Sequence, residues 1–201
     1  MKNLVIVESQ AKAKKIQGFL EKGFPSDSWK VLACLGHVRD LKDDESAVDP
    51  KDWNNLKWES TAKGKKTLKE IRDFSKNASV IYLASDPDRE GEAIAWHICK
   101  MFKLPLKSTK RIIFHEITKP AIRAAIQNPT VLDMNKVNAQ QARQVLDLLV
   151  GFTISPILWQ NISRNSKASL SAGRCQTPAL RLVYEQQQEI NKSPGKKVYN
   201  T

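Results

Sequence analysis

The chain has 201 residues, of which 41% are hydrophobic, and a formal net charge of +12. This length allows one good core, with room for a second small domain or part of a larger one. No apolar run approaches the roughly 20 residues of a membrane-spanning helix, and the opening MKNLVIVES has no secretory cleavage pattern, so the sequence predicts a cytoplasmic protein without a membrane partner.

The basic surplus lies in the second half of the chain. Residues 1–100 carry 18 Lys and Arg against 16 Asp and Glu, whereas residues 101–201 carry 15 against 5. A polyanion such as nucleic acid is the natural partner of this half, although a solubilising surplus would give the same counts. The three cysteines form no CxxC pair, so neither a disulfide framework nor a zinc site is expected, and Cys34 and Cys99 should be buried thiols.

Strands alternate with helices in the first part of the chain, which predicts an α/β layer fold with a largely parallel sheet. Strands are expected at residues 4–7, 29–35, 80–84 and 111–114, and helices at residues 11–22, 61–76, 92–102 and 119–127. Residues 43–60 are expected to form a polar loop. Leu68, Ile71 and Phe74 should form the inner face of the second helix.

From about residue 130 the strand signal disappears and helical spacing takes over. Helices are expected at residues 135–152, 155–162 and 178–190, with Pro156 in a first turn. We therefore expect a domain at residues 1–130 and a helical segment of a second domain at residues 131–201.

The strongest local signal is an acidic run directly after the strand at residues 80–84. Asp86, Asp88 and Glu90 are spaced by two, so in an extended chain their carboxylates point to one side, beyond the strand end where open parallel sheets bind ligands. Hard oxygens without His or Cys nearby favour Mg²⁺. An acidic helix N-terminus would explain Glu90, but not three acids at this spacing.

Glu8 ends the first predicted strand and should emerge at the same sheet edge as Asp86. The pKa of an acid among other acids should be raised, which suits a general acid or a shared metal ligand. A helix N-terminal carboxylate is the alternative and, from Glu8 alone, the better one. Lys12, one helical turn later, could reach a phosphate or belong to a solvated face with Lys14 and Lys15.

Six blocks spread over nearly the whole chain resemble, in order, the N-terminal motifs of type IA DNA topoisomerases of the bacterial topoisomerase I kind. They are LVIVESQAKAKKI, CLGHVRDL, YLASDPDREGEAIAWHI, RIIFHEIT, VNAQQARQVLDLLVGFTISPILW and SAGRCQTPALRLVYEQQQEI. The resemblance implies a Rossmann-like TOPRIM domain followed by the first part of a helical DNA-binding domain. It also implies relaxation of negatively supercoiled DNA by Mg²⁺-dependent cleavage and religation of one strand through a 5′-phosphotyrosine.

By this resemblance, Glu8 would protonate the leaving 3′ oxygen and Lys12 would stabilise phosphate charge. Asp86, Asp88 and Glu90 would hold Mg²⁺, with Glu8 close enough to share it.

Arg89, inside the acidic motif, would order the acidic loop or contact phosphate. His37 would lie at the strand end that faces DNA, although read alone it is a turn histidine. The DNA groove would continue along a helix and a small-residue loop whose members are Gln140, Gln141, Arg143, Gln144, Ser171, Ala172, Gly173, Arg174, Cys175 and Gln176.

No ATP is implied, because the phosphotyrosine bond would store the cleavage energy, and Gly64 does not begin a P-loop since position 59 is Glu59. Tyr82, Tyr184 and Tyr199 all lie outside the family's nucleophile motif, so we expect the chain alone not to relax DNA. Two alternatives are a small TOPRIM nuclease or primase that uses Mg²⁺ at the same acids, and a non-enzymatic module with a metal site and a basic arm. The helix of Arg143 argues against the first alternative.

Overall fold

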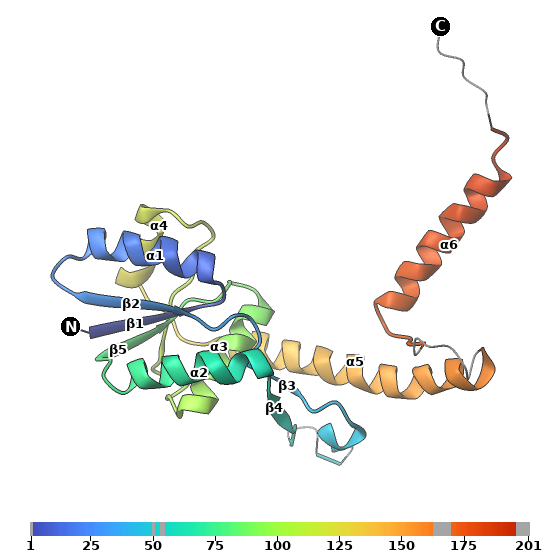
Figure 1. Cartoon of the computed structure of the whole chain (residues 1–201), viewed down its shortest axis with the longest axis horizontal. Coiled ribbons are helices and arrows are strands. Elements are labelled where there is room, and N and C mark those ends of the chain that lie inside the picture. The colour runs from blue at the N-terminus through green and yellow to red at the C-terminus, as the bar shows by residue number, and fades with distance from the viewer. Residues whose placement is uncertain (1, 50, 53–54, 163–169, 196–201) are drawn as a thin grey trace, which may run out of the picture. The chain divides into compact units, whose positions relative to one another are not determined.

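The structure is a computed structural model that describes residues 2–49, 51–52, 55–162 and 170–195 (Figure 1). It contains two compact units, Met1–Arg143 and Gln144–Thr201. The domain boundary expected after residue 130 stays a prediction, because the compact first unit also includes the first turns of the long helix that follows. In chain order the elements are β1 (Lys2–Val7), α1 (Gln10–Gly23), β2 (Ser28–Ala33), β3 (Arg39–Leu41), η1 (Glu45–Ala47), β4 (Trp58–Ser60), α2 (Ala62–Ser75), β5 (Val80–Leu83), α3 (Arg89–Phe102), β6 (Lys110–Arg111), α4 (Lys119–Gln127), α5 (Met134–Asn161) and α6 (Gln176–Lys192).

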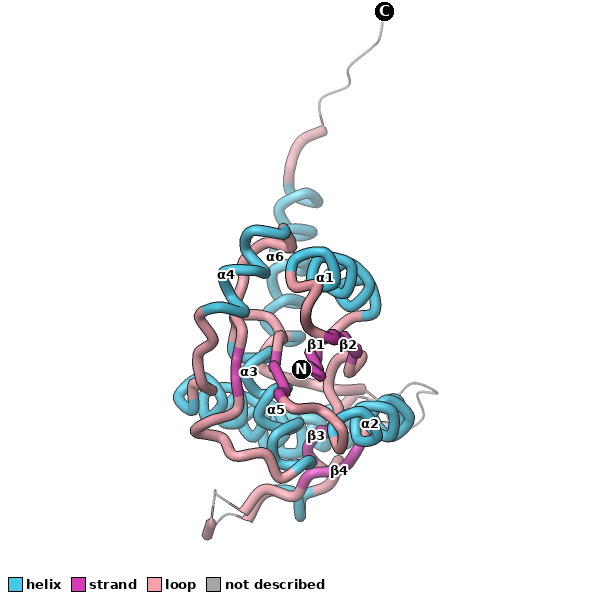
Figure 2. The backbone as a smooth tube through the Cα atoms, turned by 90° about the vertical axis from the view of Figure 1, so that its left-hand side faces the viewer, coloured by secondary structure: helices cyan, strands magenta, loops and turns pink. Residues whose placement is uncertain are grey.

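The first unit is built on a four-stranded sheet with the order β2-β1-β5-β6, and every pairing in it is parallel. Figure 1 shows α1 and α4 on one face of this sheet and α2 and α3 on the other. Figure 2, turned by 90°, shows the same separation of α1 and α4 from α2. The predicted α/β fold with a mostly parallel sheet is confirmed.

Each face of the sheet has its own core. Alternate residues of β1 point to opposite faces, so Leu4 and Ile6 pack with α2 and α3, whereas Val5 and Val7 pack with α1 and α4. All four are buried, as expected of a parallel strand covered on both sides. The thiols of Cys34 and Cys99 are buried as predicted, and burial raises the pKa of the Cys34 thiol to about 12.

Three helices of the first unit begin at side-chain caps. The hydroxyl of Ser9 begins α1, the carboxylate of Asp88 begins α3 and the hydroxyl of Thr118 begins α4 by accepting from backbone N–H groups of the first turn. Pro120 lies in the first turn of α4, where its missing N–H costs nothing. Ser9 and Asp88 lie two and five residues after the ends of β1 and β5, so α1 and α3 both begin at the carboxyl edge of the sheet.

The predicted polar loop at residues 43–60 contains structure that the pattern did not indicate. β3 and β4 form an antiparallel pair in which Leu41 lies opposite Trp58. Strands of three residues are too short to show an alternating pattern. The hairpin holds two residues beside α3. They are His37, two positions before β3, and Arg39, the first residue of β3.

Two predictions for the first unit need correction. The strand expected at residues 111–114 ends at Arg111, because after Ile112 donates to the carbonyl of Leu83 the chain leaves the sheet. Leu68 and Ile71 are buried on α2 as predicted, but Phe74 is 42% exposed. Phe74 lies in the last turn of α2, where it lines a cavity described below.

The two helices expected at residues 135–152 and 155–162 are one helix, α5, with Pro156 inside it. A proline removes one backbone hydrogen bond, at a cost of about 3 kcal/mol in a helix interior. The turns around Pro156 are anchored from outside: Ser155 Oγ exchanges hydrogen bonds with the backbone of Ala172 at 3.1 and 3.3 Å. Trp159 Nε1 donates to the carbonyl of Leu170 at 2.5 Å. These contacts favour continuation of the helix.

The last predicted helix, residues 178–190, lies within α6. Its apolar residues Leu180, Leu182, Val183 and Ile190 are all exposed in the structure. Among the described residues, no helix has the length and apolar character needed to cross a bilayer.

Candidate active site

Glu8 and Asp86 meet at the carboxyl edge of the parallel sheet. β1 and β5 are neighbours in register, with Ile6 opposite Leu83, and each is followed within three residues by its acid. The backbone N–H of Asp86 donates to Glu8 Oε1 at 2.5 Å. The two acids that were expected at one edge therefore lie side by side.

Lys12 lies between these two acids. Because Ser9 caps α1 by accepting from the backbone N–H of Lys12 at 3.3 Å, the lysine falls in the first helical turn. Its ammonium group is 3.8 Å from Glu8 Oε2 and pairs with Asp86 Oδ1. Burial raises the pKa of Glu8 and the charge of Asp86 raises it further, while the Asp86 N–H and Lys12 act in the opposite direction. The arrangement places an acid with a raised pKa beside a cation.

Glu90 belongs to a second group, formed with the start of α5. Arg143 Nη1 donates to Glu90 Oε1 at 2.6 Å and Gln140 Nε2 donates to Oε2 at 3.1 Å. His37 Nε2 lies 3.7 Å from Glu90 Oε2. Gln140 is 1% exposed, and its own Oε1 has no partner in the part of the chain that the structure describes. Both carboxylate oxygens of Glu90 are thus engaged by protein groups.

Asp88 and Arg89 differ from their neighbours in the motif. Asp88 Oδ1 accepts from the backbone N–H of Gly91 at 2.8 Å and so caps α3. The Arg89 side chain is 51% exposed, and its Nε lies 3.8 Å from Glu90 Oε1. Arg89 is therefore a largely exposed cation of this motif, and its ion-pair partner among the described residues is Glu90.

A buried ion pair that the sequence reasoning missed holds the acidic loop. Arg111 and Glu92 have side chains 0% and 1% exposed, and Arg111 Nε donates to Glu92 Oε2 at 3.0 Å. Arg111 Nη1 also donates to the carbonyls of Leu83 and Ile112 at 3.1 and 2.9 Å, and Nη2 donates to the carbonyl of Asp86 at 2.7 Å. The signal in the sequence was an arginine at the head of an apolar strand and an acid inside an apolar helix.

The peptide around Asp86 is consequently fixed from several sides. Its N–H is bound by Glu8 and its carbonyl by Arg111. A Cβ built on Gly91 would come within 2.2 Å of the same carbonyl oxygen, so this close approach requires glycine. Ser85 Oγ donates to the carbonyl of Gly91 at 2.6 Å and closes the loop.

His37 is carried by a sharp turn after β2. Leu35 and Gly36 have φ values of 62° and 88°, and the N–H of Gly36 donates to the carbonyl of Glu8 at 3.2 Å. Thr61 Oγ1 donates to the carbonyl of His37 at 3.0 Å. The turn therefore ties His37 to the edge that carries Glu8.

Behind this turn, Arg39 and His97 join β3 to α3. Arg39 Nε and Nη2 donate to His97 Nδ1 at 3.2 and 3.1 Å. The His97 ring lies 4.4 and 4.8 Å from the rings of Trp58 and Trp96, centroid to centroid. Burial, followed by the charge of Arg39, lowers the pKa of His97 to about 3. His97 is therefore a neutral structural residue.

In the second unit, the loop before α6 contains the remaining candidates. Ala172 is buried against Ser155. Arg174 Nε donates to Asp147 Oδ1 at 2.9 Å, and this hydrogen bond raises the pKa of Arg174.

Hydrogen bonds also order the rest of this loop. Gly173 N–H donates to Thr177 Oγ1 at 3.2 Å, and Gln176 Nε2 donates to Ser171 Oγ at 3.1 Å. Cys175 is exposed. Gln144 Oε1 is buried without a partner among the described residues.

The candidates of the first unit thus form two adjoining groups, Glu8–Lys12–Asp86 and His37–Glu90–Arg143. Within the described residues, no three His, Cys, Asp or Glu side chains are placed to hold one ion. Protein groups take the positions that a cation would share: Lys12 bridges the first two acids and Arg143 binds Glu90. Tyr82 is buried in β5 and Tyr184 is exposed on α6, while Tyr199 lies outside the described residues.

Comparison with known proteins identifies the family of the chain that carries this acidic edge. Residues 3–117 match the Toprim domain family, and residues 131–201 match the family described as DNA topoisomerase. The chain belongs to the type IA DNA topoisomerase family. The DNA topoisomerases 1 of two Xylella fastidiosa strains are each 49% identical to it over 193 residues, covering 94% of this chain and 23% of the relative.

The solved structure of full-length topoisomerase I from Thermotoga maritima is also similar. It is 40% identical, with a TM-score of 0.77, and the match covers 96% of this chain and 31% of that one. The topoisomerase resemblance and the Toprim fold read from the sequence are confirmed. This topoisomerase chain spans 23% of the length of the curated relatives it matches.

Proposed function

We propose that the carboxyl edge of β1 and β5 is the metal-binding and proton-transferring part of a topoisomerase active site. It would act with a tyrosine outside residues 1–201 to cut and rejoin one strand of negatively supercoiled DNA without ATP, inside the cell. The observation that carries the proposal is the contact of Glu8 with Lys12 and Asp86. It combines a proton donor, a cation and a fixed carboxylate at one point.

Glu8 is the proposed general acid for the leaving 3′ oxygen. Its raised pKa, caused first by burial, keeps a proton available nearer to neutral pH. In religation the same carboxylate would take the proton back from the 3′ hydroxyl. Lys12 would move from the two acids to a phosphate oxygen, because an ammonium group binds either partner as a point charge.

The donor set fits Mg²⁺. Glu8 and Asp86 supply hard oxygens at a place that already holds a cation, and Mg²⁺ needs only one or two carboxylates beside water and phosphate oxygens. By the resemblance, Asp88 and Glu90 would complete the set around the ion, and Glu90 would then exchange its bonds with Arg143 and Gln140 for the ion. When bound, the ion would offset the charge of the phosphate, and Arg89 would contact that phosphate from the exposed side.

Single-stranded DNA is the proposed partner of the remaining polar residues. In the first unit these are His37 and Arg143, with Gln140 buried behind them. In the second unit they are Gln144 and the loop of Ser171, Ala172, Gly173, Arg174, Cys175 and Gln176. Arg143 and Arg174 now bind the acids Glu90 and Asp147, and phosphate oxygens would replace those carboxylates.

A metal titration tests the acidic edge. Adding millimolar Mg²⁺ should shift the amide NMR signals of residues 84–92, and the Asp86→Asn/Asp88→Asn variant should lose this response. An Asp40→Asn/Glu59→Gln variant removes two exposed acids of the β3–β4 hairpin and is the matched control. Equal responses in all three proteins would argue against the site.

Two DNA measurements test the rest. The chain alone should not relax a supercoiled plasmid with Mg²⁺, and a covalent adduct on Tyr82, Tyr184 or Tyr199 would contradict this. Binding of a labelled single strand in EDTA should weaken with salt, since each neutralised phosphate adds about 0.7 to the log–log slope. Arg143→Ala or Arg174→Ala should lower that slope by up to about one. Wild-type slopes in both variants would place the groove elsewhere.

A further inference from the structure

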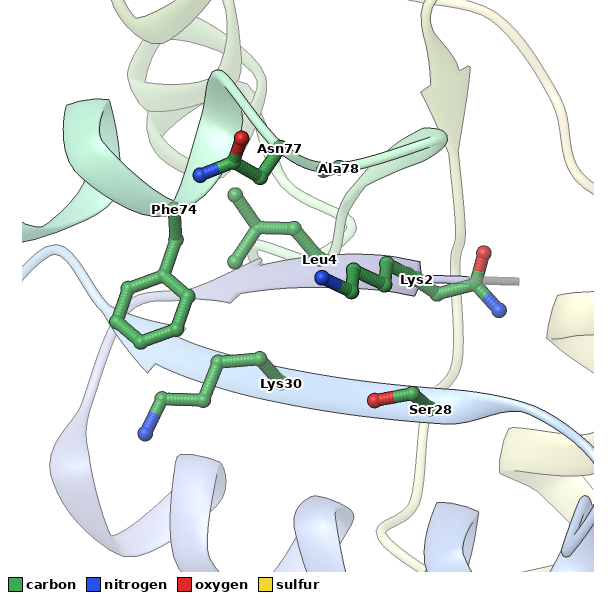
Figure 3. Close-up of a pocket in the computed structure, with 8 residues that line it drawn as sticks. Lys2, Leu4, Ser28, Lys30, Phe74, Asn77 and Ala78 are labelled. Carbon is green, nitrogen blue, oxygen red and sulfur yellow. The ribbon is translucent and has the colours of Figure 1, made fainter.

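A cavity lies at the end of the sheet opposite to the acidic edge (Figure 3). Its volume is about 240 Å³, and the side chains used below are Lys2, Leu4, Lys30, Phe74, Asn77 and Ala78. β1 runs from Lys2 at the cavity to Val7 beside Glu8, so the cavity is one strand length, roughly 20 Å, from the candidate active site. It is a separate feature of the first unit.

The cavity arises because this face of the sheet extends beyond the end of α2, the helix that covers it. Lys2 and Leu4 are two residues apart on β1, and Lys30 is paired in register with Leu4, so all three point to the face under α2. Leu4 is buried with Ile71 of α2, whereas Lys2 and Lys30 are exposed. The outer part of the face is therefore open and carries positive charge.

The wall of the cavity beyond α2 is a turn whose backbone N–H groups bond to carbonyls at the end of the helix. The N–H groups of Lys76, Asn77 and Ala78 donate to the carbonyls of Arg72, Phe74 and Ser75 at 3.3, 3.2 and 3.4 Å. These bonds engage three of the last four carbonyls of α2, those of Arg72, Phe74 and Ser75.

A further bond ties this wall to the sheet. The N–H of Ser79 donates to the carbonyl of Lys2 at 2.7 Å. The cavity is thus preformed, and a ligand would bind without first ordering its walls.

Its chemistry combines two cations with an apolar floor. Lys30 Nζ lies 5.0 Å from the centroid of the Phe74 ring, and Figure 3 shows the side chain of Lys2 reaching into the same space. No ion pair of Lys2 or Lys30 is found in the described part of the chain. No acid is among the described residues that line the cavity, while Phe74 and Ala78 supply accessible apolar surface.

We propose that this cavity binds one nucleotide. The phosphate would lie between the ammonium groups of Lys2 and Lys30, and the base would lie against Phe74 and Ala78 with the amide of Asn77 at its edge. The volume of about 240 Å³ lies below the roughly 300–1,000 Å³ typical of ligand pockets, so no more than one nucleotide would enter the cavity. The nucleotide is either free or part of a single strand, since both present a phosphate beside a flat ring. The proposal does not rest on the function of the acidic edge.

The test uses the whole chain and the amide NMR signals of Leu4, Phe74 and Asn77. Deoxyadenosine monophosphate, inorganic phosphate and a short oligodeoxyadenylate are the probes. The Lys2→Gln/Lys30→Gln variant should weaken binding of the tighter nucleotide probe about tenfold or more, because charge-assisted contacts to phosphate are lost. The Lys14→Gln/Lys15→Gln variant, which removes the same charge from α1, should bind within about twofold of wild type, and Phe74→Leu should weaken nucleotide binding but not phosphate binding.

The NMR responses distinguish a free nucleotide from a nucleotide of a single strand. Cavity signals that respond to the mononucleotide alone identify a free nucleotide, and signals that respond more tightly to the oligonucleotide identify a strand. Either result supports the proposal. It is overturned if neither probe moves these signals, if inorganic phosphate binds as tightly as the mononucleotide, or if both lysine variants lose affinity equally.

Discussion

The two units contain apolar residues at the same helical spacing, with opposite results. On α3 of the first unit, Ile94 and Ile98 are 4% and 2% exposed, whereas on α6 of the second unit Leu180 and Val183 are 69% and 68% exposed. The difference is that α3 faces a sheet and α6 faces no described element that covers it. Helical spacing therefore determines which residues share a face, and a facing element determines whether that face is buried.

The same contrast holds for charge. The first unit buries the pair of Arg111 and Glu92 completely, whereas the pair of Arg174 and Asp147 in the second unit is 40% exposed on both sides. Exposed pairs add little to stability, but removing one partner of a buried pair leaves an uncompensated charge. Rigidity should thus be concentrated in the unit that carries the acidic edge.

The largest effect is expected from breaking the buried pair. Arg111→Ala should lower the free energy of unfolding of the first unit by about 3–5 kcal/mol, because Glu92 remains buried without a partner. Urea unfolding followed by tryptophan fluorescence measures this. Arg174→Ala is the control in the second unit and should leave the curve nearly unchanged. An Arg111→Met/Glu92→Met variant should recover much of the lost free energy of unfolding. Equal losses in Arg111→Ala and Arg174→Ala would contradict the contrast between the units.

A pH-dependent effect is expected next, from His97. Its pKa is lowered from 6.5 to about 3 in the folded state, so the stability it contributes is fully present above pH 6.5 and is lost as the pH falls towards 3. The loss should be about 1.4 kcal/mol per pH unit, or about 2 kcal/mol by pH 5. His97→Asn, whose side-chain oxygen can still accept from Arg39, should unfold with a shallower pH dependence. Parallel unfolding curves of the two proteins from pH 7 to pH 4 would contradict this assignment.

Substituting two glycines by alanine should change stability by smaller amounts and in opposite directions. Gly91→Ala should destabilise the first unit by about 1–3 kcal/mol, because the new methyl group meets the Asp86 carbonyl. Gly151→Ala in α5 has nothing within 4 Å of its Cβ and should stabilise the helix by up to about 1 kcal/mol. Thermal unfolding of both variants measures the difference. Two changes of the same sign would count against the close approach at Gly91.

The smallest effect is expected on α6. Leu180→Ala or Val183→Ala should change the free energy of unfolding by less than about 0.5 kcal/mol, because little surface is buried there. Urea unfolding and hydrogen exchange of α6 provide the measurement. A loss above about 2 kcal/mol, typical of truncating a buried leucine, would show that this face is packed in solution.

Several features of the active site could be read from the sequence because they depend on local spacing. Glu8 follows an apolar run and Asp86 follows another, and parallel strands bring such ends to one edge. The first turn of α1 then places Lys12 beside them. The α5 helix was predicted in two pieces because Pro156 usually marks a helix start, and the contacts of Ser155 and Trp159 with the loop before α6 carry the helix through it.

By itself, the sequence determined the strands and helices of the parallel layer, the layer fold and the family, since each follows from the period of apolar residues or from short motifs. It did not determine the β3–β4 hairpin or the continuity of α5. The tertiary structure alone decided that Arg111 holds the carbonyl of Asp86, that Arg143 binds Glu90, and that a cavity opens beside Lys2. The first two contacts join residues 25 and 53 positions apart, and the cavity is lined by residues of β1, of β2 and of the end of α2 with the turn that follows it. No local pattern encodes such distances, because the direction of each side chain depends on how the sheet and its helices pack.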